Sequence, residues 1–282
     1  MRTTLRSLWL LLATLVSFSA LAAPKAELWS FWDKHGSSTG ISHQAWQDIL
    51  DKYLVTEGEY TLFRYGQVSQ QDKTKLQNYL KALSGVDPRT YTKPEQYAYW
   101  VNLYNALTVD LIIKEYPVKS ITKLGGLFSF GPWDQELITV QGKELTLNDI
   151  EHKILRPIWN DPRTHYAVNC ASLGCPNLQT QAFTADNTEA LLEQAANTFI
   201  NSNKGANLKG NSLELSSIYD WFAVDFGGEK RVLAHLAKYR PELADFSGKV
   251  RFEYDWNLNQ AKTRTWLSEK VFLLSSAISS QH

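Results

Sequence analysis

The segment from about Thr92 to Tyr116 most constrains the fold of this 282-residue chain. It contains the run EQYAYWVNLYNALTVDLIIKEY, which is apolar nearly all round. Pro94 in the first turn and Pro117 just beyond the last are placed where a helix begins and stops. A helix without a polar face has to be covered on every side. We therefore expect one long central helix that the rest of the chain buries.

Shorter elements are expected on both sides of this helix. Apolar residues at helical spacing predict amphipathic helices at residues 42–54, 70–83, 146–157, 184–200 and 229–239. Thr146, followed three residues later by Asp149, predicts a side-chain cap for the third of these. Turn residues between apolar runs predict hairpins at 137–145 and 208–215, and alternation predicts a strand at 250–256. Without a repeat or a linker, the pattern predicts a single α+β domain over residues 23–282.

The N-terminus has the pattern of a secretory signal peptide. Arg2 and Arg6 precede an apolar run from Leu8 to Leu21, and Ala20-Leu21-Ala22 is a small-x-small cleavage site. The apolar run is short for a membrane span, so an uncleaved anchor is the weaker alternative. We expect residues 1–22 to be removed near Ala22/Ala23, leaving a periplasmic or secreted protein.

Charge and hydropathy limit the partners of the mature chain. The formal net charge is zero, and removing Arg2 and Arg6 leaves 27 basic and 29 acidic side chains, a net charge of −2. Nothing in this balance favours nucleic acid or anionic lipid. Asn102, Asn105 and Asp110 interrupt the most apolar helix, so no integral membrane segment is expected after cleavage. The partner expected is a small-molecule, peptide or envelope ligand, and no cofactor is predicted.

The stretch Asp161 to Pro176, DPRTHYAVNCASLGCP, concentrates the unusual chemistry of the chain. It contains both cysteines of the sequence and His165. We expect a buried strand from Tyr166 to Cys170, followed by a turn of small and polar residues at its end. Alternation along such a strand would place His165 and Cys170 on opposite faces.

His152, on the helix just upstream, is therefore the better partner for Cys170, with Glu151 beside it in sequence. One hypothesis is a thiol nucleophile at Cys170, activated by His152, with Glu151 nearby and the amides of residues 171–174 stabilising an oxyanion. This arrangement predicts a thiol-dependent hydrolase or acyl transferase. Papain-like enzymes differ, because their cysteine begins a helix and their histidine lies far downstream.

The alternative is a non-catalytic binding or interaction module of the cell envelope with structural cysteines. In an oxidising compartment Cys170 and Cys175 are first a candidate disulfide, although so short a loop stabilises little. A turn fixed in this way would still present Asn169, Ser172 and His165 to a ligand. A redox role is weaker, because the spacing is not C-x-x-C. His152, His165 and the two cysteines are donors that zinc accepts, but their spacing fits poorly and no metal site is predicted.

Asn102 and Asn105 are three residues apart on the central helix and so share a face. Buried amides have to be hydrogen-bonded. Either both side chains hold neighbouring loops in place, or they line the site.

Five blocks of the sequence have the character of family motifs: YAYWVNLYNAL (97–107), LNDIEHKILR (147–156), DPRTHYAVNCASLGCPNL (161–178), IYDWFAVDFGG (218–228) and YDWNLN (254–259). Together they resemble the DUF547 domain family of bacteria and plants. They occur in order over most of the mature chain, which supports one domain. The family is named for its lack of an assigned function, so the resemblance implies no reaction. It does imply that Asn102, Asn105, Glu151, His152, His165, Cys170 and Cys175 are motif positions.

Overall fold

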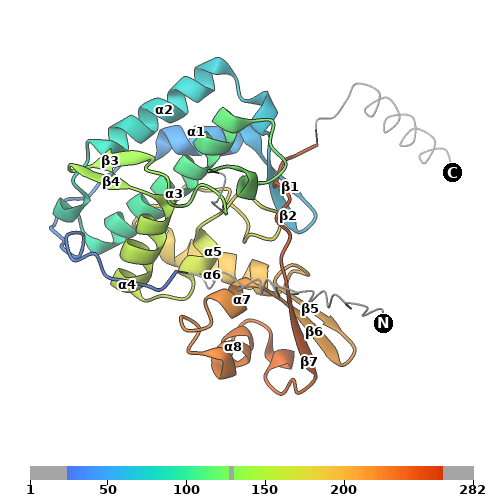
Figure 1. Ribbon diagram of the computed structural model, residues 1–282. Helices are drawn as coiled ribbons and strands as arrows, with labels where there is room; N and C mark the ends of the chain where they lie inside the picture. The colour runs from blue at the N-terminus through green and yellow to red at the C-terminus, as the bar shows by residue number, and fades with distance from the viewer. Residues whose placement is uncertain (1–23, 127–129, 263–282) are drawn as a thin grey trace, which may run out of the picture.

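The computed structural model describes residues 24–126 and 130–262, so the signal peptide expected at residues 1–22 lies outside the described part. The fold is α+β, with helices, two short hairpins and a small mixed sheet (Figure 1). Within the described residues, no helix has the length and apolar character needed to cross a membrane.

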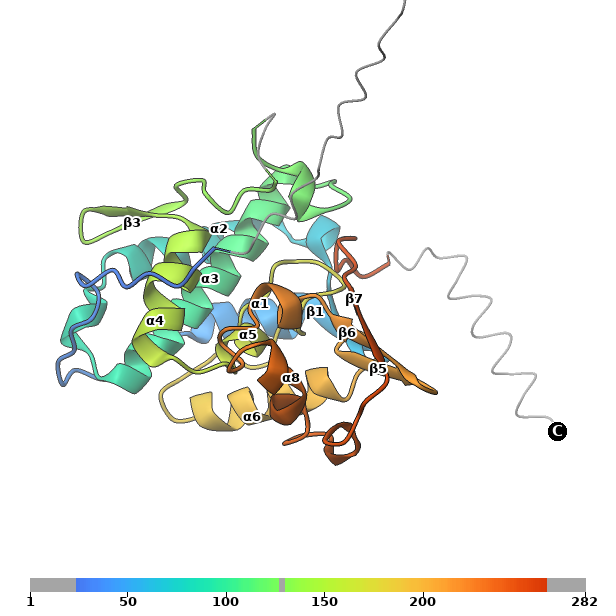
Figure 2. The same cartoon turned by 60° about the horizontal axis from the view of Figure 1, so that its bottom comes forward.

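The larger core is built around α3 (Lys93–Glu115). Every residue of α3 from Glu95 to Ile113 is buried, which confirms the central helix predicted from its sequence. The helices α1 (Gln44–Tyr53) and α2 (Gln70–Ser84) add their apolar faces to this core, and α3 contacts α2 directly (Figure 2).

Two antiparallel hairpins border this core. β1 (Leu54–Glu57) pairs with β2 (Tyr60–Phe63), and β3 (Ile138–Val140) pairs with β4 (Lys143–Leu145). The second hairpin turns at Gln141 and Gly142, both of which have positive φ, as a type I′ hairpin turn requires. This confirms the hairpin predicted at 137–145.

A smaller second core lies at the bottom of the molecule in Figure 1. α6 (Thr188–Ile200) leads into a sheet of β5 (Ala206–Lys209), β6 (Ser212–Ser216) and β7 (Lys249–Glu253). β5 and β6 form the predicted antiparallel hairpin, whereas β7 lies parallel to β6. The crossover from β6 to β7 contains α7 (Ile218–Trp221) and α8 (Glu229–Leu236). Short 3-10 helices connect other elements at η1 (Tyr65–Gln67), η2 (Pro88–Thr90), η3 (Ile121–Lys123) and η5 (Pro241–Leu243).

The strand predicted from Tyr166 to Cys170 is wrong. The chain there forms the short helix α5 (Thr164–Ala167) and becomes extended only at Val168. Asp161 starts the helical turn, because its side chain accepts a hydrogen bond from the Arg163 amide and its carbonyl accepts one from the Thr164 amide. A short buried apolar run has the same composition in a helix and in a strand. The strand alternation that separated His165 from Cys170 therefore does not apply.

Candidate functional site

The predicted helix at 146–157 is a π-helix, η4 (Asp149–Leu155), that continues as α4 (Arg156–Trp159). Its start has the predicted cap: Thr146 Oγ1 accepts from the Asp149 amide, and Asp149 Oδ2 accepts from the Thr146 amide, both at 3.0 Å. Wide π-helical turns occur frequently at functional sites. This one carries Glu151 and His152, which are both buried.

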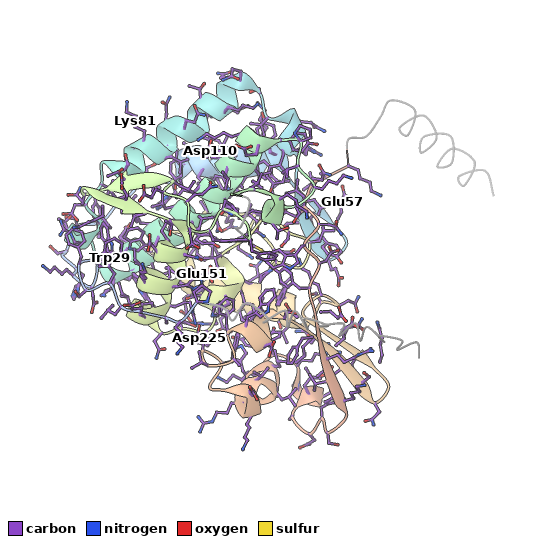
Figure 3. The ribbon with its side chains drawn as sticks, viewed as in Figure 1. Trp29, Glu57, Lys81, Asp110, Glu151 and Asp225 are labelled. Atoms are coloured by element: carbon purple, nitrogen blue, oxygen red, sulfur yellow. A yellow bond between two sulfur atoms is a disulfide. The ribbon has the colours of Figure 1, made fainter. Side chains whose placement is uncertain are left out.

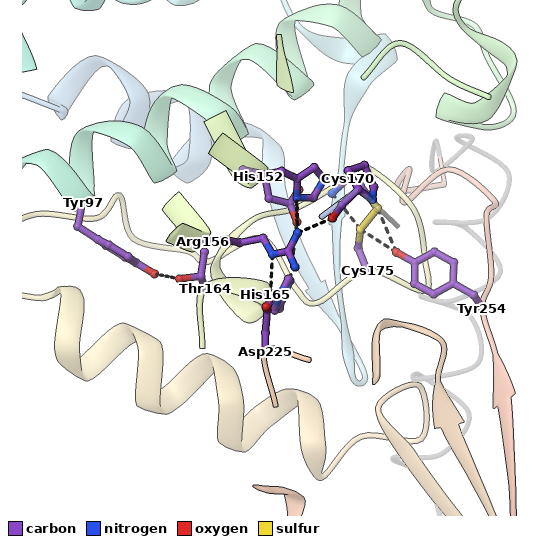
Figure 4. Close-up of polar contacts among 11 residues, drawn as sticks. Tyr97, His152, Arg156, Thr164, His165, Cys170, Cys175, Asp225 and Tyr254 are labelled. Atoms are coloured by element: carbon purple, nitrogen blue, oxygen red, sulfur yellow. Dashed lines mark hydrogen bonds and ion pairs between the residues drawn. A yellow bond between two sulfur atoms is a disulfide. The ribbon is translucent and has the colours of Figure 1, made fainter. Parts of the chain in front are cut away.

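Arg156 links this segment to the distant loop after α7. Its Nε donates to Asp225 Oδ2 at 2.6 Å, and its Nη1 donates to His152 Nδ1 at 3.0 Å and to the Pro24 carbonyl at 2.7 Å (Figure 4). Asp225 lies near Glu151 where the part around α3 meets the part that contains β5–β7 (Figure 3).

His165 on α5 completes the group. Its Nε2 is 2.6 Å from Asp225 Oδ2, and its Nδ1 is 3.7 Å from Glu151 Oε1. The same Glu151 oxygen is 3.9 Å from His152 Nδ1. The His165 ring stacks on Phe222 with centroids 4.3 Å apart. We call Glu151, His152, Arg156, His165 and Asp225 the buried charge cluster.

The hydrogen bonds of the cluster fix protonation states. A guanidinium only donates, so His152 Nδ1 accepts, and the proton of the neutral ring is on Nε2. Burial lowers the pKa of His152 to about 4, with the charge of Glu151 opposing and that of Arg156 assisting. Burial alone would raise the pKa of Asp225, but the hydrogen bonds from His165 and Arg156 outweigh it and hold that pKa well below its usual range. The His152 ring is thus a neutral partner of Arg156 near pH 7.

Cys170 and Cys175 form a disulfide with an S–S distance of 1.99 Å. The Tyr254 hydroxyl is 3.1 Å from each sulfur, and Ser172 Oγ is 3.0 Å from the Cys170 sulfur. Ser172 is buried, with its hydroxyl against the two sulfurs. Among the described residues, the His152 ring accepts a hydrogen bond from Arg156 and forms none with Cys170.

Three predicted site asparagines bond to backbone groups. Asn102 exchanges two hydrogen bonds with the Phe183 amide and carbonyl. Asn105 donates to the Ala167 carbonyl at 2.9 Å and accepts from the Asn169 amide at 2.8 Å. The Asn169 side chain in turn accepts from the Ala171 amide and donates to the Pro176 carbonyl. Asn105 and Asn169 therefore hold the segment around the cysteines in its conformation, whereas Asn102 holds the chain at Phe183.

A polar cleft of about 570 Å³ borders the disulfide turn. Leu173 and Gly174 of the turn form one wall, and Tyr254 contributes to both the cleft and the disulfide contacts. The turn is fixed to the chain after β7, because the Leu173 amide donates to the Asn257 carbonyl and the Gly174 amide donates to the Asp255 carbonyl, both at 2.8 Å. The cleft is large enough for a small-molecule or short peptide ligand.

Asp225 and Tyr254 were not predicted as site residues from the sequence. Both lie in sequence blocks that resemble DUF547 domains, and this resemblance is the sequence signal that could have identified them. Lys204, which lines the cleft, follows α6 in a polar loop and had no such signal. Within residues 24–126 and 130–262, no group of three or more histidine, cysteine or acidic side chains is arranged to hold a metal ion.

Residues 88–200 match the family model described as "Protein of unknown function, DUF547". This part of the chain is a DUF547 domain. The DUF547 match contains α3, η4, α5, both cysteines and α6, whereas Lys204, Asp225 and Tyr254 lie beyond it. No curated protein and no solved structure matches the chain.

Proposed function

We propose that this protein is an exported ligand-binding module of the cell envelope, whose cysteines are structural and whose ligand occupies the cleft beside the disulfide turn. The observation that carries this proposal is the Cys170–Cys175 bond. The sequence has two cysteines, so this bond leaves no thiol for nucleophilic attack. The same bond closes the turn that contributes Leu173 and Gly174 to the cleft.

The surroundings of Cys170 also favour binding over thiol chemistry. A catalytic cysteine needs a basic partner that lowers its pKa and accepts its proton. The polar side-chain neighbours of the Cys170 sulfur are the hydroxyls of Ser172 and Tyr254. Burial raises the pKa of the Tyr254 phenol well above its ordinary value, so this hydroxyl is not a base near pH 7.

The proposal that the protein is exported rests on the N-terminal sequence, in which Arg2 and Arg6 precede the apolar run to Leu21. A disulfide is the expected state of paired cysteines in the periplasm or outside the cell. We infer cleavage near Ala22/Ala23. An intact mass of the protein recovered from the periplasm or medium that corresponds to loss of residues 1–22 supports this inference, and a full-length mass in the membrane fraction contradicts it.

The decisive measurement for the cysteines is alkylation of protein purified from an oxidising compartment. We expect no alkylation of Cys170 or Cys175 before reduction and alkylation of both afterwards, measured by intact mass. Rapid alkylation of Cys170 without reduction would overturn the binding proposal in favour of a thiol-dependent hydrolase or acyl transferase. Binding itself is tested by NMR, in which a cleft ligand shifts the backbone amide signals of Leu173, Gly174 and Asn207. Shifts confined to other regions would contradict the proposed site.

A further inference from the structure

Lys204 is the basic residue of the cleft and is held in an unusual environment. Its Nζ donates to the Cys175 carbonyl and to Asn177 Oδ1, both at 2.7 Å. The same nitrogen lies 4.9 Å from the centroid of the Tyr60 ring and 5.9 Å from that of Phe199. The ammonium is therefore surrounded by neutral oxygens and aromatic rings, and it fixes the disulfide turn from the cleft side.

No carboxylate in the described part of the chain forms an ion pair with Lys204. Burial lowers its pKa to about 7, and the charge of Glu59 only partly opposes this effect. Glu59 itself accepts a hydrogen bond from the Asn203 amide at 2.8 Å. A partly buried cation without a counter-charge is costly, and an anion that enters the cleft would stabilise it.

Acidic side chains lie elsewhere in the cleft lining. Glu214 is within 4 Å of both Lys209 and Arg251, which partly neutralise it. Glu253 and Asp255 form no such ion pair among the described residues, although Asp255 Oδ1 accepts from the backbone and side-chain amides of Asn257. These two carboxylates are suited to receive a positive group.

We propose that the cleft binds a short peptide with free ends, whose carboxylate pairs with Lys204 and whose ammonium lies at Glu253 and Asp255. This inference rests on the proposed binding function and specifies its ligand class. A cleft of about 570 Å³ accommodates a ligand of two or three residues. The Tyr60 and Tyr254 rings, which also line the cleft, provide apolar surface for the peptide between the two charged ends.

Peptide binding should be coupled to protonation of Lys204. A carboxylate beside the amine raises the pKa of Lys204 above its value of about 7 in the free protein. The complex then binds more protons than the free protein, so affinity decreases as the pH rises above about 7. Other titratable groups near the amine or in the cleft are Glu59, Tyr60, Glu214, Glu253, Tyr254 and Asp255.

The test uses trialanine, trialanine amide and N-acetyl-trialanine as probes in calorimetric and NMR titrations of the full mature protein. We expect trialanine to bind and the amide, which lacks the carboxylate, to bind at least about tenfold more weakly. Lys204→Met should weaken the binding of trialanine to the level of the amide, while the matched Lys81→Met, at an exposed lysine of α2, should leave that binding unchanged. Glu253→Gln should weaken the binding of trialanine but leave the binding of N-acetyl-trialanine unchanged.

A second readout does not depend on a variant folding. Titration of the wild-type protein near pH 7.5 in buffers of different ionisation enthalpy should show proton uptake on binding of N-acetyl-trialanine, whose blocked amine cannot itself take up a proton. Equal affinity for trialanine and its amide, no saturable binding of either, or no proton uptake would overturn the inference. These outcomes differ from a free Cys170 thiol, which would overturn the proposed function itself.

Discussion

Arg156 and Asp225 are 69 residues apart in the sequence, and Arg156 Nε lies 2.6 Å from Asp225 Oδ2. The arginine side chain is 3% exposed and the aspartate 19%. This ion pair joins α4, which packs on the core around α3, to the loop that follows α7 in the second core. The buried charge cluster thus connects the two hydrophobic cores.

Arg156→Met should destabilise the protein by up to about 3–5 kcal/mol, because it removes the arginine partner of the half-buried Asp225 carboxylate. Urea unfolding followed by tryptophan fluorescence measures this change. The control is Lys75→Met, which breaks an ion pair with Asp48 in which both side chains are about 40% exposed. That change should cost at most about 1 kcal/mol. Similar losses in both variants would contradict a structural role for the Arg156 pair.

Asn105→Leu should cost roughly 2–5 kcal/mol, because it leaves the Ala167 carbonyl and the Asn169 amide buried without partners. Leucine keeps the branching and the number of side-chain heavy atoms of asparagine but is larger, so the loss combines the two hydrogen bonds with a packing cost. Asn78→Leu on the exposed face of α2 is the matched control and should be nearly neutral. If Asn105 serves a ligand rather than the fold, the two variants will unfold at the same urea concentration.

Sequence patterns correctly predicted the elements whose conformation depends mainly on their own residues. The apolar run of α3 and the turn at Gln141-Gly142 specify their own conformations, and the structure has both. The α5 segment did not follow its pattern, because burial on all sides removes the alternation that separates a strand from a helix. The disulfide was one of several alternatives, since spacing alone does not distinguish a bridge from a free thiol.

The site was only partly predictable for a related reason. Glu151, His152 and Cys170 were predicted as site residues because they lie close together in the sequence. Asp225 reaches the buried charge cluster, and Lys204 reaches the cleft, through long-range packing. The partners of Lys204 are a backbone carbonyl and an asparagine oxygen. Such contacts leave no pattern in a single sequence, because a backbone carbonyl is present at every residue.

Three buried histidines should make the protein sensitive to mild acid. Burial lowers the pKa of His43, His152 and His235 from 6.5 to about 4. Between these values the unfolded chain binds more protons than the folded protein, so the free energy of unfolding should decrease as the pH falls from 6.5 to 4. Urea unfolding at a series of pH values measures this slope.

His43→Gln separates this effect from the titration of carboxylates. The Tyr79 hydroxyl lies 2.7 Å from His43 Nδ1, and a glutamine oxygen can accept the same hydrogen bond without titrating. The variant should show a shallower loss of stability between pH 6.5 and 4 than the wild type. An unchanged slope would contradict the lowered pKa of His43, because His43 would then bind as many protons in the folded protein as in the unfolded chain.

Gly174→Ala should disturb the cleft at its wall. A Cβ at this position would lie 2.8 Å from the Asp255 amide nitrogen and 3.1 Å from the Asp255 carbonyl oxygen. These backbone atoms cannot rotate away, so the turn or the chain after β7 has to shift, at a cost of about 1–3 kcal/mol. The expected result is a lower unfolding midpoint together with displaced NMR signals for the Asp255 and Asn257 amides. Gly85→Ala is the control, because its added Cβ would meet the Ala82 carbonyl at an ordinary 3.5 Å. If Gly174→Ala leaves both the midpoint and those signals unchanged, the disulfide turn does not fix the position of the cleft wall.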